Sequence, residues 1–167
     1  MAIDLSDFDI EEAEGQVAHL SDKLDWRDLQ ESQDCLITVQ YNEIDLGQTP
    51  YHFNQPFEGN EANLYFQRMK EFSELTVNYI VDHCDYKAHF NRTDIRGNIK
   101  KVFDSINPNI AKANPLIIHF ALDPESTVTN ACRATGVRNP RVYFMIGYNG
   151  MIHILFFDPF HELNPIG

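Results

Sequence analysis

The stretch that decides the fold is residues 141–159, RVYFMIGYNGMIHILFFDP. Two apolar runs flank Asn149-Gly150. This dipeptide between apolar runs predicts a β-hairpin, because a type I′ turn needs positive φ at both central residues. The sequence therefore predicts two paired antiparallel strands, 141–148 and 151–158.

Both strands of this hairpin are apolar on both faces. In the first strand, one face carries Val142, Phe144 and Ile146, and the other carries Tyr143 and Met145. In the second strand, strict alternation places Phe156 with Ile152 and Ile154, and Phe157 on the opposite face. A strand that is apolar on both faces lies centrally in a sheet that is covered on each side.

The rest of the chain supplies two further strands and a long helix. The segments 35–41 and 115–122 are rich in β-branched residues and read as strands. Residues 60–84 carry apolar side chains at a helical period, and Thr93 is expected to cap a later helix. The sequence predicts an α+β fold, in which this long helix packs on an antiparallel sheet of four strands.

The charge is uneven along the chain. The net charge is −12, and residues 1–67 hold two basic and 15 acidic residues. Helix-capping signals and acidic first turns predict an acidic helical segment over 1–34, followed by a single domain over 35–167. We expect Asp25, Asp28 and Glu31 to attract a basic protein partner. The alternative is an ordinary acidic surface that maintains solubility.

An aromatic-rich loop follows the first predicted strand. Residues 46–60 hold two prolines and two glycines, which predict a loop, and also Tyr51, Phe53 and Phe57. These aromatic residues either dock on the core or form part of a binding surface.

Composition and motif searches exclude several classes of protein. No run of 18 apolar residues exists, so we expect no membrane span, and the acidic N-terminus is not a signal peptide. Three scattered cysteines without a CxxC motif suit a reducing cytoplasm. Neither GxxxxGK[ST] nor GxGxxG occurs, and His83 and His89 lack metal-ligand spacing. We therefore expect no cofactor and no metal.

A basic set lies on the stretch that holds Thr93 and the helix expected after it. Arg92, Arg96 and Lys100 are each one helical turn apart, which is a spacing that could hold phosphates on one face. The alternative is a solvated helix face with local salt bridges. The net charge of −12 disfavours nucleic-acid binding by the whole chain.

The end of the hairpin offers the best candidates for acid–base chemistry. Asp158 precedes a proline, so it is expected to end the strand and hydrogen-bond the turn. His161 lies beyond the strand in a polar tail and is the most plausible acid or base. His119 and His153 alternate with aliphatic residues and are expected to be ordinary sheet-face histidines.

The segment 141–165 resembles a pattern in small proteins of bacterial mobile elements and phage defence. In that pattern an arginine-led apolar strand is followed by a second strand ending in DPxHxhxP, where h is apolar. Arg141, Asp158 and His161 match it. The order of helices and strands also resembles the RelE-like toxin fold. The toxins of that fold act on ribosome-bound RNA and are strongly basic, whereas this chain is acidic.

Two functions follow as expectations. The first is a small cytoplasmic interaction protein that binds a basic partner through its acidic surface, with Tyr51, Phe53 and Phe57 as apolar anchors. The second is a RelE-like ribonuclease with His161 as the acid or base. Its phosphates would be held by one or more arginines, taken from Arg92, Arg96, Arg133, Arg138 and Arg141. The absence of a local catalytic motif favours the first.

Overall fold

The structure is a computed structural model that describes residues 35–83, 90–106 and 115–164. The predicted acidic segment 1–34 lies outside the described residues, and so do its candidate binding residues. In chain order the elements are β1 (Thr38–Gln40), α3 (Glu61–Phe72), α4 (Val77–Asp82), β2 (Phe90–Thr93), α5 (Gly97–Ile106), β3 (Ile117–Ala121), β4 (Arg141–Ile146), the 3₁₀ turn η2 (Tyr148–Gly150) and β5 (Met151–Asp158).

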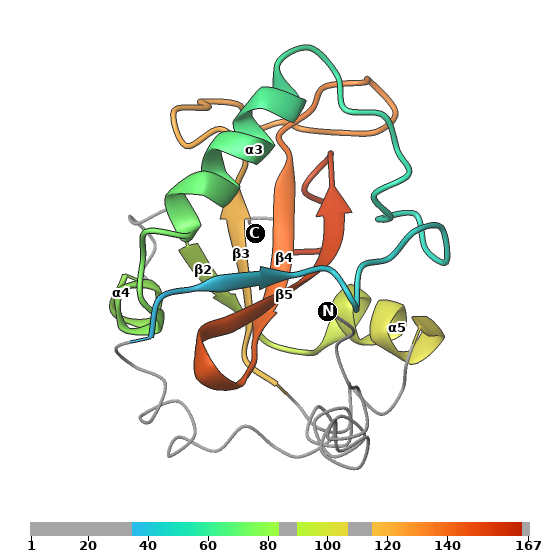
Figure 1. Ribbon diagram of the computed structural model, residues 1–167. Helices are drawn as coiled ribbons and strands as arrows, with labels where there is room; N and C mark the ends of the chain where they lie inside the picture. The colour runs from blue at the N-terminus through green and yellow to red at the C-terminus, as the bar shows by residue number, and fades with distance from the viewer. Residues whose placement is uncertain (1–34, 84–89, 107–114, 165–167) are drawn as a thin grey trace, which may run out of the picture.

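The described residues form an α+β fold around one five-stranded sheet, in the order β1-β5-β4-β3-β2 (Figure 1). Three of the four pairings are antiparallel, as predicted, but β1 runs parallel to β5, so the sheet is mixed. The parallel pairing is possible because a long connection containing α3, α4 and α5 separates β1 from β5. None of the helices described is long and apolar enough to cross a bilayer.

The β4–β5 hairpin lies where it was predicted, but its loop is longer than a two-residue type I′ turn. The Gly147 N–H donates to the Met151 carbonyl at 2.7 Å, so the loop comprises the three residues of η2, and the hairpin also has an unpredicted irregularity. Asn149 has φ 54° and Gly150 has φ 75°, so both turn residues adopt the left-handed conformation. Tyr143 pairs with Phe156 and Phe144 pairs with Ile154, so Leu155 is an extra residue in β5.

This bulge changes which side chains of β5 share a face. Phe157, rather than Phe156, joins Ile152 and Ile154 in one core cluster, and Phe156 joins Leu155 in the other. The predicted alternation through Phe156 was therefore wrong. The prediction that Phe156 and Phe157 are buried on opposite faces is confirmed.

The predicted helix 60–84 is broken into α3 and α4. In an unbroken helix the Leu75 carbonyl would accept from the Tyr79 N–H. Instead the Thr76 hydroxyl accepts from the Tyr79 N–H at 3.2 Å and caps α4, while the Leu75 carbonyl accepts from the Ile37 N–H at 3.0 Å. The break therefore ties the two helices to the start of β1.

The edge strand β2 was not predicted. Thr93 was expected to cap a helix, but it ends β2 and pairs with Ile117 of β3. Its hydroxyl lies 2.7 Å from Nδ1 of His119, so that hydroxyl serves a partner across the sheet. The helix itself begins at Gly97.

The sheet has a hydrophobic cluster on each face, as the two-sided strands predicted. In the first cluster α3 and α4 cover one face of the sheet, and the Phe72 ring contacts the rings of Phe90, Phe120 and Phe144. On the other face α5 contributes buried side chains to the second cluster, including Phe103, whose ring packs against that of Phe156. β4 and β5 thus lie centrally between two helical layers.

Removing the Phe156 ring should empty a large site in the second cluster. Phe156 is fully buried, and its ring centroid lies 5.2 Å from that of Phe103. We expect Phe156→Ala to lower the free energy of unfolding by about 3–5 kcal/mol. Urea unfolding of the variant measures this. Phe66→Ala, at an exposed aromatic position, is the control and should change stability by less than about 0.5 kcal/mol. Equal stability of the two variants would contradict the described core.

Candidate functional site

The aromatic loop is organised by Asp45. This carboxylate is buried and accepts hydrogen bonds from the N–H groups of Gly47, Gln48 and Thr49 at 2.9, 2.7 and 3.0 Å, and from the Thr49 hydroxyl. The Asp45 N–H donates to the carbonyl of the bulge residue Leu155 at 2.9 Å. One side chain therefore folds the start of the loop and fixes it to β5.

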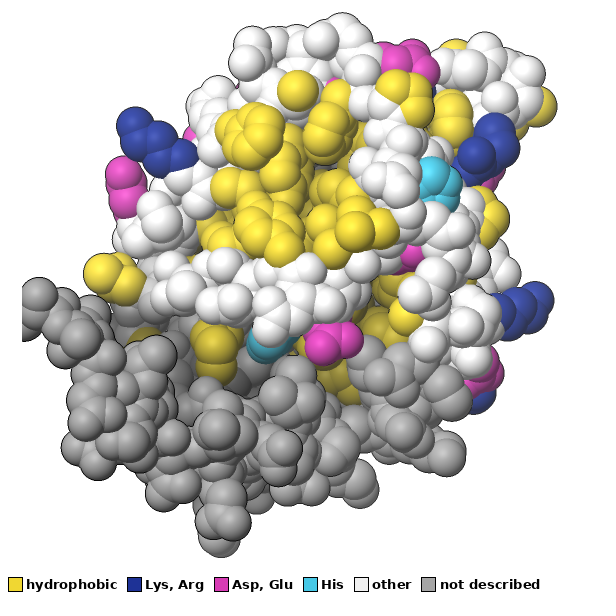
Figure 2. All heavy atoms as spheres, turned by 45° about the vertical axis from the view of Figure 1, so that its right-hand side comes forward, with side chains coloured by type: hydrophobic (Ala, Val, Ile, Leu, Met, Phe, Trp, Pro, Cys, Tyr) yellow, Lys and Arg dark blue, Asp and Glu magenta, His cyan; other side chains and the backbone are white. Residues whose placement is uncertain are grey.

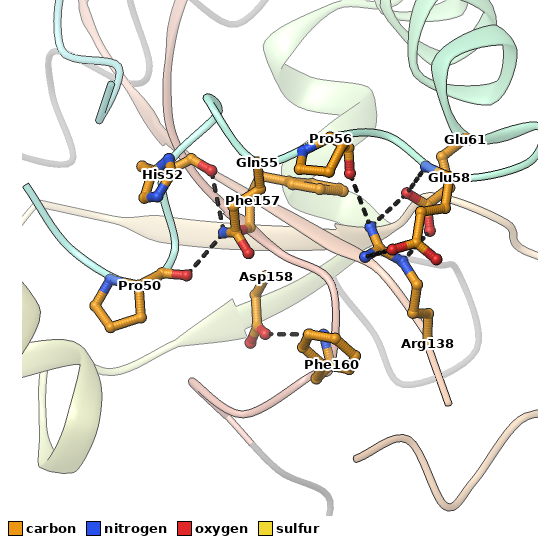
Figure 3. Close-up of polar contacts among 10 residues, drawn as sticks. All are labelled: Pro50, His52, Gln55, Pro56, Glu58, Glu61, Arg138, Phe157, Asp158 and Phe160. Carbon is orange, nitrogen blue, oxygen red and sulfur yellow. Dashed lines mark hydrogen bonds and ion pairs between the residues drawn. The ribbon is translucent and has the colours of Figure 1, made fainter. Parts of the chain in front are cut away.

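The rest of the loop continues along β5. The Phe157 N–H donates to the Tyr51 carbonyl at 2.8 Å. The Gln55 side-chain amide donates to the carbonyls of Pro50 and His52 at 2.7 and 3.1 Å (Figure 3). The loop therefore pairs with β5 beyond the point where β1 ends.

The loop and α3 together build an aromatic surface, which we define as Tyr41, Phe53, Phe57 and Phe66. These residues are arranged around the buried ring of Tyr65. Phe53 and Phe57 contact the Tyr65 ring at centroid distances of 5.7 and 5.6 Å. Tyr65 contacts Phe66 at 5.5 Å, and its hydroxyl lies 3.3 Å from that of Tyr41. Phe66 is 67% exposed and Tyr41 is 44% exposed. Figure 2 shows a broad apolar patch on this side of the molecule.

The structure separates the three aromatic residues predicted as anchors. Phe53 and Phe57 pack against the first cluster and contribute to the aromatic surface. Tyr51 packs against the second cluster on the opposite face. Burial, and secondarily the nearby carboxylates of Asp158 and Glu162, raise the pKa of the Tyr51 phenol.

Arg138 clamps this region. Its Nε and Nη2 donate to the two Glu61 carboxylate oxygens at 2.7 and 2.6 Å, and Nη1 donates to Glu58 at 3.0 Å (Figure 3). Its side chain is only 12% exposed and lies near the Phe157 and Phe160 rings. The clamp joins the connection before β4 to the start of α3, and these ion pairs occupy the Arg138 guanidinium.

A second group of polar residues gathers where β3, β4 and β5 meet. We call it the histidine cluster: His119, Arg141, Tyr143, Asp158 and His161. The sheet register pairs His119 with Tyr143 and Arg141 with Asp158. The His161 ring lies 5.9 Å from the His119 ring, and His119 lies 4.9 Å from Tyr143. The three predicted catalytic residues are therefore brought together with two that were not predicted.

Asp158 has the structural role that its position predicted. Its carboxylate accepts from the N–H groups of Phe160 at 3.2 Å and Leu163 at 2.7 Å. These bonds close the chain after β5 and hold Leu163 in the second cluster. Burial raises the pKa of Asp158, and these backbone N–H groups oppose that rise.

The sequence had indicated that His161 lies in an exposed polar tail, and this prediction was wrong. His161 has φ 55° and is partly buried. Its Nε2 is enclosed and has no hydrogen-bond partner among the described residues. Burial, and secondarily the Arg141 guanidinium, lower its pKa to about 4. The ring is therefore neutral at pH 7, and one of its nitrogens has a lone pair that can accept a proton.

His119 is the neighbouring imidazole of the cluster, and its ring is more deeply buried than that of His161. It is 3% exposed, and burial, followed by the charges of His161 and Arg141, lowers its pKa to about 3. Arg141 is itself buried enough that its pKa is lowered, and Nη1 donates to the Asn139 side-chain oxygen at 2.7 Å. The cluster can bear one fixed positive charge beside two neutral imidazoles.

The predicted basic set lies beside this cluster. Arg92 and Arg96 line a pocket of about 190 Å³ that is also bounded by Thr93, Asp94 and residues of the chain end. Lys100 does not line it and pairs with Asp104 at 2.6 Å. The described residues contain no group of three potential metal ligands of the His, Cys, Asp or Glu type.

Residues 1–34 are not among those described, so the structure does not place Asp25, Asp28 and Glu31. Sequence reasoning also missed several residues of these sites. Asp45 could have been found, because an aspartate two residues before a glycine is a frequent turn-former. Nothing in the spacing links Thr93, His119 and Tyr143, which meet only through strand register.

The lowered histidine pKa values make stability depend on pH. Each folded-state pKa lies below the usual 6.5, so the unfolded chain binds more protons as the pH falls. Stability should therefore be complete above about pH 6.5 and decline toward pH 4. The raised pKa of Asp158 acts in the opposite sense.

This effect can be isolated with His161→Asn, which cannot titrate. Between pH 6.5 and 4.5 the unfolding free energy of the wild type should fall more steeply than that of the variant. The difference should be at most about 1.4 kcal/mol per pH unit, and smaller because the ring is partly screened by solvent. His83→Asn, at an exposed site, is the matched control and should follow the wild type. Parallel curves for wild type and His161→Asn would contradict the assigned burial.

Comparisons with protein-family models, with curated proteins and with solved structures found no match to this chain. Function is therefore argued from the aromatic surface and the histidine cluster.

Proposed function

We propose that this protein is an interaction protein that binds a protein partner through the aromatic surface. The observation that carries the proposal is the exposure of Phe66, at 67%, in a continuous chain of contacts with Tyr65, Phe53 and Phe57. Broad apolar patches on a soluble surface mark sites of association, and aromatic residues are enriched at interfaces.

The proposed protein partner binds through a segment that has apolar side chains at its centre and basic residues on either side. Residues 35–67 supply the strand β1, the loop and the first half of α3, and they contain four acidic residues and no Lys or Arg. The net charge of the whole chain is −12. A basic partner is therefore favoured by long-range attraction, which salt screens over about 10 Å at 0.1 M.

The cellular setting belongs to the same proposal. We place the protein in the cytoplasm of a bacterium carrying a mobile element or a phage-defence locus, on the strength of the resemblance over 141–165. Cys35 and Cys132 are free thiols among the described residues, which suits a reducing compartment.

The test begins with a photo-crosslinking residue placed at position 66, or at position 79 as the control. Tyr79 is 44% exposed on α4, where it stacks on His83 rather than joining the aromatic surface. The proposal predicts a specific product from position 66 alone. Equal crosslinking from both positions, or a product consisting of a second copy of this chain, would contradict it.

Affinity for the purified partner then provides the quantitative test. Phe66→Ser should weaken binding by about thirtyfold, the scale of a buried interface anchor, while Tyr79→Ser should leave it unchanged. Rising salt should slow association, as should neutralising Asp25, Asp28 and Glu31, with the melting temperature unchanged. An affinity indifferent to Phe66→Ser would remove the proposal.

A second candidate is a ribonuclease, favoured by the neutral and partly exposed imidazole of His161 beside Arg141. In this reaction the His161 imidazole would accept the proton of the RNA 2′-hydroxyl as the hydroxyl oxygen bonds to phosphorus. The bond from phosphorus to the 5′-oxygen would break, and the leaving oxygen would take a proton from water. Arg141 would stabilise the charge on the phosphoryl oxygens.

This candidate predicts a large effect from a small change. His161→Asn should lower RNA cleavage by roughly a hundredfold or more, the scale of a lost general base, with no comparable fall in melting temperature. His83→Asn is the matched control and should retain full activity. Absence of RNA cleavage by the wild type, or full activity of His161→Asn, would exclude the ribonuclease.

A further inference from the structure

The pocket beside the histidine cluster has the features of an anion site. Its walls come from the end of β2, the turn into α5 and the chain after β5. We propose that this pocket binds the phosphate group of a phosphate ester. The proposal is independent of the aromatic surface, and the pocket would hold substrate phosphate in the second candidate function.

Two arginines of the pocket are available for a ligand. Among the described residues, none accepts a hydrogen bond from the Arg92 guanidinium. Arg96 has an 85% exposed side chain, and its Nη2 lies 3.7 Å from the Asp94 carboxylate, beyond hydrogen-bonding distance. Asp94 is a lining carboxylate that opposes anion binding, and the two guanidinium groups outweigh its single charge. Arginine matches phosphate oxygens in pairs of parallel hydrogen bonds.

The backbone at the pocket adds to this charge. α5 begins at Gly97, and the Lys100 N–H donates back to the Arg96 carbonyl at 3.4 Å. The N–H groups before Lys100 lack partners within the helix, and no acidic side chain lies in the first turn. The positive end of the helix dipole therefore lies beside the two arginines.

The size of the pocket limits what can enter. At about 190 Å³ it is far larger than the 10–15 Å³ that one water needs. It is smaller than the roughly 300–1,000 Å³ that enclose drug-sized ligands. A phosphate with part of its ester group fits these limits, while a base would remain outside. Binding should therefore depend on phosphate and be indifferent to base identity.

The pocket is coupled to the histidine cluster by a shared wall. Thr93 lines the pocket, and its hydroxyl is hydrogen-bonded to His119 at 2.7 Å. Leu163 lines the same pocket and is held by Asp158. Phosphate bound at this wall should therefore shift the ring NMR signals of His119, which provides a readout besides affinity.

The experiment uses the full chain and three probes at low salt: inorganic phosphate, uridine monophosphate and a short labelled oligouridylate. Affinity is measured by calorimetry for the small probes and by fluorescence anisotropy for the RNA. The double variant R92Q/R96Q should weaken binding of the probe that binds the wild type by at least about tenfold. K101Q is the matched control, because Lys101 is exposed on the same helix and does not line the pocket.

The salt dependence of affinity gives a second measurement for the RNA probe. Loss of two phosphate contacts should reduce the slope of log affinity against log salt by about 1.4, or 0.7 for each contact on single strands. K101Q should retain the wild-type slope. If only the oligouridylate binds, the ligand is single-stranded RNA. If phosphate and uridine monophosphate bind as well, the ligand is a small phosphate ester. Either outcome supports the pocket.

Two results would overturn the proposal. One is that the folded wild type binds none of the three probes. The other is that R92Q/R96Q binds them as the wild type does, with no change in the His119 signals. The outcome is separable from the ribonuclease, because RNA that is bound but uncleaved excludes only the enzyme. RNA that is cleaved equally well by R92Q/R96Q excludes only the pocket.

Discussion

The outer edge of β5 is the constraint on which the rest of the structure depends. β5 is buried along almost its whole length, so its backbone groups require partners within the protein. β1 has three residues and pairs only with Met151–His153. The Leu155 carbonyl and Phe157 N–H are satisfied instead by the backbone of Asp45 and Tyr51. The loop after β1 is therefore held in place as a substitute for a longer edge strand.

The aromatic surface is a consequence of this pairing. Once the loop lies along β5, Phe53 and Phe57 fall on the Phe157 ring, at centroid distances of 5.6 and 4.9 Å. The same rings meet Tyr65 of α3, while Arg138 ties the start of α3 to the connection before β4. Apolar contact area is thus presented on a rigid support, and under the proposed function this rigidity would lower the entropy lost on binding.

The histidine cluster depends on the register of the central strands, and not on the pairing along the outer edge of β5. Pairing of β3 with β4 sets His119 against Tyr143, and pairing of β4 with β5 sets Arg141 against Asp158. Asp158 then turns the chain so that His161 returns to His119. Burial keeps both imidazoles neutral beside a cation, and the pocket of Arg92 and Arg96 shares the Thr93 wall. Charge and proton acceptors are therefore adjacent but separated by one side chain.

Local signals in the sequence determined the hairpin, the left-handed backbone at Asn149 and Gly150, and the burial of β4 and β5 on both faces, because these follow from turn chemistry and from apolar periodicity. They also predicted that Asp158 hydrogen-bonds the turn after β5, because aspartate before proline is a local turn signal. Only the tertiary structure decided the parallel pairing of β1, the break at Thr76, the bulge at Leu155 and the meeting of Thr93 with His119. These features depend on which distant backbone groups compete for the same hydrogen bonds, and no local pattern records that competition.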